Sequence, residues 1–153
     1  MKSIICILFT VLLASCASAS KATNPDSPAL DKASNDSALY YEIGGKATLD
    51  KIFGLAIARI YNDPVIGRYF DKVPKRHLRM HLVDQVCVLI NGPCTYTGKS
   101  MKESHQGLSI TESEFYILVE YVRGAMEDIG LTPQQENLIL QKLAPLKSQI
   151  VGL

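Results

Sequence analysis

The chain has 153 residues, a net charge of +1 and 20% charged residues. Its charges are balanced, and no basic block alternates with aromatic residues, so nothing favours nucleic acid as a partner. No internal repeat is visible, which argues against a repeat architecture. Length and composition therefore favour one globular domain.

The N-terminal segment is typical of an export signal. Met1 and Lys2 precede the apolar run IICILFTVLLAS, which is too short for a confident membrane span. The run ends in LASC, residues 13–16, which resembles the lipobox of bacterial lipoproteins, with Leu13 at its start and Cys16 as the acylated residue. We therefore predict a signal peptide over residues 1–15 and a lipid anchor at Cys16, at the cell envelope or periplasm. Simple cleavage after Ala19 and an uncleaved anchor are the alternatives.

Residues 16–37 are small and polar, which predicts a flexible linker, and residues 38–153 are predicted to form the folded domain. Cys87 and Cys94 lie in this domain, and an exported protein can form disulfides. A helix stop and a turn separate them, so the chain can fold Cys94 back toward Cys87. We favour a disulfide between them, with two free thiols as the alternative.

The domain has the pattern of an all-helical protein. Over residues 46–61 the apolar residues recur at intervals of three and four, and Leu55 and Ala58 extend the apolar surface almost around the helix. This predicts a central helix. Asp63-Pro64 ends it, and Pro74 opens a second helix that extends to about Asn91.

Two further long helices follow. The first covers residues 112–129 and opens with a capping box of Thr111 and Glu114, and a third capping box, Thr132-Pro133 with Gln135, opens the last one. That helix carries the apolar residues Leu138, Leu140, Leu143, Leu146 and Ile150, and Pro145 is expected to kink or split it. Four longer helices with short links, and no alternating strand pattern, predict a helical bundle or globin-like packing.

The stretch SMKESHQGLSIT, residues 100–111, predicts a very short helix. Ser100 with Glu103 forms one capping box, and Gly107 ends the helix that carries His105 on its last turn. So short a helix buries little by itself. His105 is therefore either a core histidine bonded to a carbonyl or the axial ligand of haem, a flat cofactor that supplies the packing surface. No C-x-x-C-H motif is present, so covalent attachment of haem is not expected.

The other two histidines, His77 and His81, lie four residues apart and so face the same side of the second helix. That spacing can hold a metal such as zinc, although a complete site needs three or four ligands and only Asp84 is near. A solvated surface residue is the preferred interpretation of His77.

Four segments resemble group 1 truncated haemoglobins. They are LYYEIGG (39–45), the DP and YF pairs of residues 63–70, NGPCTYTGKSMKESHQGLSIT (91–111) and APLKSQIV (144–151). The resemblance implies a truncated globin, a two-over-two helical sandwich around a non-covalent b-type haem. It also implies that His105 is the proximal iron ligand, with its second ring N–H bonded to a backbone carbonyl.

By position, the resemblance also assigns the cofactor pocket. Lys99 or Lys102 reaches a propionate, or both are simply solvated. The residues that line the haem are Phe70, Leu78, Leu82, Met101, Ile110, Phe115 and Val119.

The distal side departs from the family pattern. Ile57 stands where the family commonly has a tyrosine, and Leu78 and Leu82 stand where it has hydrogen-bond donors. Dioxygen gains partial negative charge when it binds, and a site without donors stabilises that charge poorly. Tyr61 is a candidate replacement, although packing is its preferred role. His81 stands where some relatives carry a second iron ligand, and a place at the pocket mouth is the alternative.

These observations predict a haem protein at the cell envelope that reversibly binds a diatomic gas: oxygen, with nitric oxide and carbon monoxide as further ligands. An enzyme, either a nitric oxide dioxygenase or a peroxidase-like protein, is the alternative and would need distal polar groups that are scarce here. A third hypothesis is a metal-binding lipoprotein that uses His77 and His81. An unidentified reductase is a candidate partner.

Overall fold

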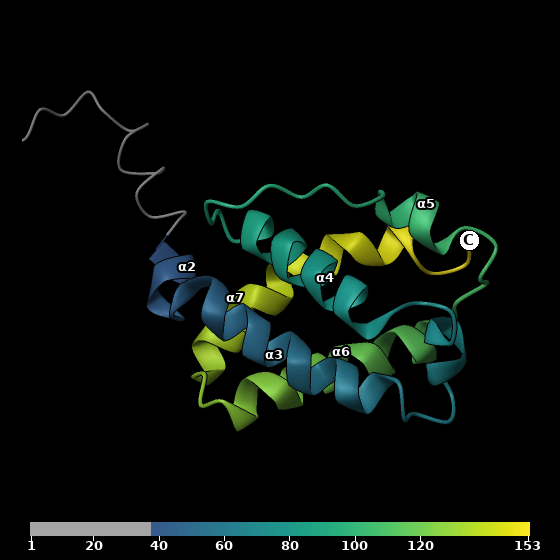
Figure 1. Ribbon diagram of the computed structural model, residues 1–153, viewed down its shortest axis with the longest axis horizontal. Coiled ribbons are helices and arrows are strands. Elements are labelled where there is room, and N and C mark those ends of the chain that lie inside the picture. The colour runs from purple at the N-terminus through teal and green to yellow at the C-terminus, as the bar shows by residue number, and fades with distance from the viewer. Residues whose placement is uncertain (1–37) are drawn as a thin grey trace, which may run out of the picture.

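A computed structural model describes residues 38–153, and the predicted signal peptide, Cys16 and the linker lie outside the described residues (Figure 1). Within this range all regular elements are helices. None of them is long and apolar enough to cross a membrane.

The helices follow the predicted order, with one addition. A short helix, α2, precedes the first predicted one, and Pro145 splits the last one into α7 and the 3-10 helix η2, as expected. The elements are α2 (Ala38–Glu42), α3 (Gly45–Ile60), η1 (Gly67–Phe70), α4 (Lys75–Leu89), α5 (Met101–His105), α6 (Glu112–Asp128), α7 (Pro133–Leu143) and η2 (Ala144–Gln149).

The four long helices form two layers. α3 makes its most extensive contacts with α4 and α6, and α7 contacts both α6 and α4. The pair α3 and α4 therefore lies over the pair α6 and α7, while α5 lies at one edge beside η2 (Figure 1). This arrangement matches the predicted two-over-two sandwich.

Local sequence signals set the helix boundaries. α3 follows Gly44, whose φ of 91° is left-handed, a conformation that favours glycine. α5, α6 and α7 each begin with a complete capping box, in which a hydroxyl and a side-chain carboxylate or amide bond reciprocally to backbone N–H groups. All three predicted capping boxes are therefore present.

The main core is built around α3, as predicted, but some apolar residues of the long helices lie outside it. Leu55 is 39% exposed and Ala58 is exposed, because α4 and α6 cover only part of the α3 surface. In α7, Leu138 is 44% exposed while Ile139 is 1% exposed. The buried face of α7 follows the helical spacing of Glu136, Ile139, Leu140 and Leu143, which leaves Leu138 outside it.

A disulfide joins Cys87 to Cys94, with Cα atoms 5.9 Å apart, as the sequence interpretation favoured. Cys87 is fully buried at the end of α4. A Cβ at Gly92 would lie 2.4 Å from Cδ2 of Tyr40 and 2.6 Å from Sγ of Cys87, so only glycine fits there. The disulfide thus fixes the start of the link that leads to α5.

Candidate functional site

The short helix α5 is held firmly at its start. The Glu103 carboxylate accepts hydrogen bonds from Oγ of Ser100 at 2.6 Å and from its backbone N–H at 2.9 Å. These bonds lower the pKa of Glu103. After His105, the chain turns at Gly107, whose φ is 81°. The local sequence therefore fixes both ends of a five-residue helix that has little packing surface of its own.

His105 ends α5 with a defined ring orientation. Its Nδ1 lies 2.7 Å from the carbonyl oxygen of Met101. A carbonyl only accepts hydrogen bonds, so Nδ1 carries the proton and Nε2 keeps its lone pair in the neutral ring. This is the predicted bond to a backbone carbonyl, and it orients an imidazole for metal coordination.

A second contact holds α5 from the C-terminal side. The backbone N–H of Ser109 donates to the carbonyl of Leu153 at 2.8 Å, and that of Gly152 donates to the carbonyl of Ile110 at 3.0 Å. Figure 1 shows α5 beside this C-terminal segment. These two backbone hydrogen bonds thus tie the segment that directly follows His105 to the C-terminal residues.

The predicted pocket residues come from η1, α4, α5, α6 and the links on either side of α5, and most of them are half-buried. Phe70, Leu78 and Leu82 pack against the main core from η1 and α4. Met101, Phe115 and Val119 are half-buried on α5 and α6, Ile110 is 9% exposed, and Lys99 and Lys102 are exposed. Large apolar side chains that keep part of their surface open, together with an imidazole that offers Nε2, fit a haem.

The distal candidates provide little polarity. Ile57 is buried on α3 and, like Leu78 and Leu82, has no polar side-chain atom. The Tyr61 hydroxyl donates to the Val73 carbonyl at 2.5 Å, and burial raises the pKa of Tyr61. Its ring lies 5.6 Å from that of Phe70. Tyr61 therefore braces the segment before α4, in the packing role that the sequence favoured.

The structure pairs the two histidines of α4. Nε2 of His81 lies 3.1 Å from Nε2 of His77, while the buried Nδ1 of His81 has no hydrogen-bond partner among the described residues. Within residues 38–153 no group of three His, Cys, Asp or Glu side chains could hold a metal ion. The predicted two-histidine metal site thus lacks the further ligands that it needs.

Tyr96 is a neighbour of His81 that the sequence interpretation missed. Its ring centroid lies 6.0 Å from that of His81, and its hydroxyl donates to the Lys99 carbonyl at 2.7 Å. The YTG motif that contains Tyr96 was part of the family resemblance. Nothing in the local sequence indicated that its ring faces α4, because the contact depends on the path of the link.

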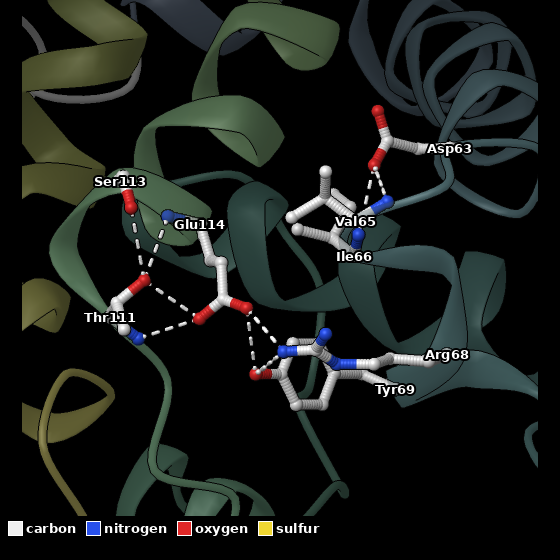
Figure 2. A network of polar contacts seen from close by, with 8 residues as sticks. All are labelled: Asp63, Val65, Ile66, Arg68, Tyr69, Thr111, Ser113 and Glu114. Atoms are coloured by element: carbon white, nitrogen blue, oxygen red, sulfur yellow. Dashed lines mark hydrogen bonds and ion pairs between the residues drawn. The ribbon is translucent and has the colours of Figure 1, made fainter.

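A polar network joins η1 to the start of α6, and the sequence did not predict it. Glu114 accepts bonds from Thr111 with Oε2, and Oε1 lies 2.5 Å from Arg68 and 3.1 Å from the Tyr69 hydroxyl (Figure 2). The same turn is fixed by Asp63, which accepts bonds from the backbone of Val65 and Ile66. The network thereby positions Phe70 relative to α6.

Glu114 is expected to make stability depend on pH. Bonds from Thr111 in the first place, and from Tyr69 and Arg68, lower its pKa below the ordinary 4.5. The stabilisation is therefore present above about pH 4.5 and is lost as the pH falls through the lower, folded-state pKa. The stability difference between wild type and Glu114→Gln should shrink in that acidic range. Urea unfolding at several pH values, followed by circular dichroism, measures it.

Glu127→Gln is the matched control, because Glu127 is an exposed carboxylate on the same helix. Its difference from wild type should stay small throughout. Parallel stability curves for wild type and Glu114→Gln would contradict the assigned role of Glu114.

Fold and site together define a class: a two-layer helical sandwich that carries one oriented imidazole on a short helix is typical of truncated globins. The chain belongs to the bacterial-like globin family, whose family model matches residues 38–151. It is 28% identical over 112 residues to the group 1 truncated hemoglobin GlbN of Mycolicibacterium paratuberculosis, covering 73% of this chain and 82% of the relative. The Tetrahymena thermophila group 1 truncated hemoglobin is 25% identical over 96 residues, or 63% and 79% of the two chains.

Solved structures agree on the fold. The Fe(III) form of truncated hemoglobin from Tetrahymena pyriformis superposes with a TM-score of 0.72 at 21% identity, covering 75% of this chain and 98% of that one. Truncated hemoglobin THB11 from Chlamydomonas reinhardtii gives 0.64 at 25% identity, covering 73% and 93%. The predicted fold class is thus confirmed, and the family implies a haem cofactor.

Proposed function

We propose that the protein is a gas-binding haem protein in which His105 holds the iron of a non-covalent haem b. The observation that carries this proposal is the 2.7 Å bond from Nδ1 of His105 to the Met101 carbonyl. It fixes the tautomer and leaves Nε2 as the coordinating atom. Oxygen, nitric oxide and carbon monoxide are the proposed ligands.

The haem would supply an iron atom with one coordination position for a gas. The residues of this chain determine how well a gas is held there. His105 would hold the iron from α5, and Phe70, Phe115 and Val119 would line the site and keep water out of it. Ile57, Leu78 and Leu82 offer no hydrogen to a ligand that gains negative charge on binding. We therefore expect weaker retention of oxygen relative to carbon monoxide than in a globin with a distal donor.

His81 is the proposed second ligand of the resting iron. It lies between Leu78 and Leu82 on α4, is half-buried, and has its Nδ1 buried. These features suit a residue at the edge of the apolar stripe that Leu78 and Leu82 form on α4. Rapid nitrate formation from nitric oxide would instead favour the dioxygenase alternative. That activity would need a distal hydrogen-bond donor, and the Tyr61 hydroxyl already donates to the Val73 carbonyl.

Absorption spectra of the purified protein, ferric and ferrous, test the proposal. We expect a Soret band, a ferric spectrum that combines five- and six-coordinate features, and a shift on addition of carbon monoxide. Acidic butanone should extract the haem completely, because no covalent bond holds it. A colourless protein that takes up no added haem would contradict the proposed function.

We also propose that an acylated Cys16 tethers the domain at the cell envelope. The support is the LASC motif at residues 13–16, which lies outside the described residues, and the disulfide, which suits an oxidising compartment. The intact mass of the mature protein distinguishes the outcomes: an acylated N-terminal Cys16 supports the anchor, whereas an unmodified N-terminus after Ala19 would exclude it.

A further inference from the structure

The histidine pair of α4, His77 and His81, contains an unusual contact. The two Nε2 atoms lie 3.1 Å apart and the ring centroids 4.3 Å apart, with the ring planes at 85°. One ring must donate its N–H while the other accepts with its lone pair. Nε2 of His81 is therefore engaged with His77 and is not free to coordinate a metal while the pair persists.

This contact is the single polar interaction that holds the His81 ring among the described residues. Nδ1 of His81 is buried without a hydrogen-bond partner, and the other neighbouring ring, Tyr96, meets it edge to face. A buried ring nitrogen without a partner disfavours the paired arrangement. His77 is exposed, so water can replace His81 as its partner. Separation of His81 from His77 thus breaks one hydrogen bond, and water can replace that bond for the exposed His77.

We propose that His77 is a positioning residue that competes with the haem iron for the imidazole of His81. While His77 holds His81, the gas position is open, and when His81 leaves His77 it closes that position. This inference rests on the proposed function, because it needs a haem held by His105. It adds that a surface residue outside the pocket sets the fraction of molecules that are ready to bind a gas.

His77→Ala should shift the resting iron toward six coordination. A typical hydrogen bond has a modest net free energy, which corresponds to about a two- to tenfold change in the equilibrium between the two arrangements. Binding of carbon monoxide, followed after flash photolysis, should slow by about the same factor. His77→Gln keeps a hydrogen-bonding side chain and should recover part of the wild-type rate.

The His81→Ala background shows whether His77 acts through His81. There the iron should be five-coordinate, carbon monoxide should bind fast, and adding His77→Ala should change neither property. Arg76→Ala is the matched control, because Arg76 is an exposed cation next to His77 and lies outside the pair. It should leave coordination and binding rate at wild-type values.

A spectroscopic readout reports the pair directly. In the ferrous protein with carbon monoxide bound, His81 is displaced from the iron and should pair with His77. The ring nitrogen signals of His81, observed by 15N nuclear magnetic resonance, should therefore change on His77→Gln or His77→Ala and stay unchanged on Arg76→Ala.

Three results would overturn the inference while haem binding stands: an unchanged spectrum and carbon monoxide rate in His77→Ala, an equal effect of that change in the His81→Ala background, or a resting spectrum that His81→Ala leaves unchanged. A failure of the proposed function is distinct from these, since it would show as wild-type protein that takes up no haem.

Discussion

His105→Ala is expected to abolish stable haem retention. Removing even an outer partner of a metal ligand weakens metal binding by about 10–100-fold, and loss of the ligand itself should exceed that. His105 is the one histidine of α5, and its bond from Nδ1 to the Met101 carbonyl orients its ring. No other side chain of this helix can supply an imidazole in its place. Haem content after gel filtration and the Soret band measure the effect.

Two further variants make the result specific to the imidazole. Ser104→Ala changes an exposed side chain on the same helix and should keep the haem. His105→Gly leaves space in which added imidazole can bind, so its Soret band should return in millimolar imidazole. A His105→Ala protein that stays red, with spectra like those of the wild type, would refute the assignment of the proximal ligand.

Loss of the disulfide should lower the free energy of unfolding by about 2–3 kcal/mol, toward the low end for disulfides because the closed loop is short. The bond spans a sequence separation of 7 residues, and it limits the conformations of the unfolded chain. Cys87→Ala combined with Cys94→Ser removes the bond without burying a hydroxyl at the fully buried position. Urea unfolding of the double variant and of wild type measures the difference.

Chemical reduction provides the control for this prediction. Dithiothreitol should destabilise wild type by a similar amount and should leave the double variant unchanged, because the double variant has no bond to reduce. Two reactive thiols from Cys87 and Cys94 in unreduced, denatured protein would show that the bond does not form.

Predictions that depended on neighbouring residues in the sequence agree with the structure. Ser100 with Glu103, and Thr111 with Glu114, form their capping boxes within a single turn. The bond from His105 to Met101 likewise joins residues four positions apart on one helix. Such contacts need only the local backbone conformation, which the order of residues determines.

Predictions that depended on how helices meet were less accurate. Leu55 and Leu138 are exposed because the faces that α3 and α7 bury are chosen by their partner helices. Glu114 was recognised as a capping residue, but its contacts with Arg68 and Tyr69, 46 and 45 residues away, could not be predicted. The haem contacts carried over from the family, apart from the orientation of His105, stay predictions.

The backbone bonds that join Ser109 and Ile110 to Leu153 and Gly152 have a consequence for biosynthesis. The segment that directly follows α5 is held by residues that are synthesised more than forty positions later, so these bonds form only after the C-terminus has been made. The pair α3 and α4 can assemble earlier, because these two helices adjoin in the sequence. Haem capture should therefore be a late event, which follows synthesis of the C-terminal residues.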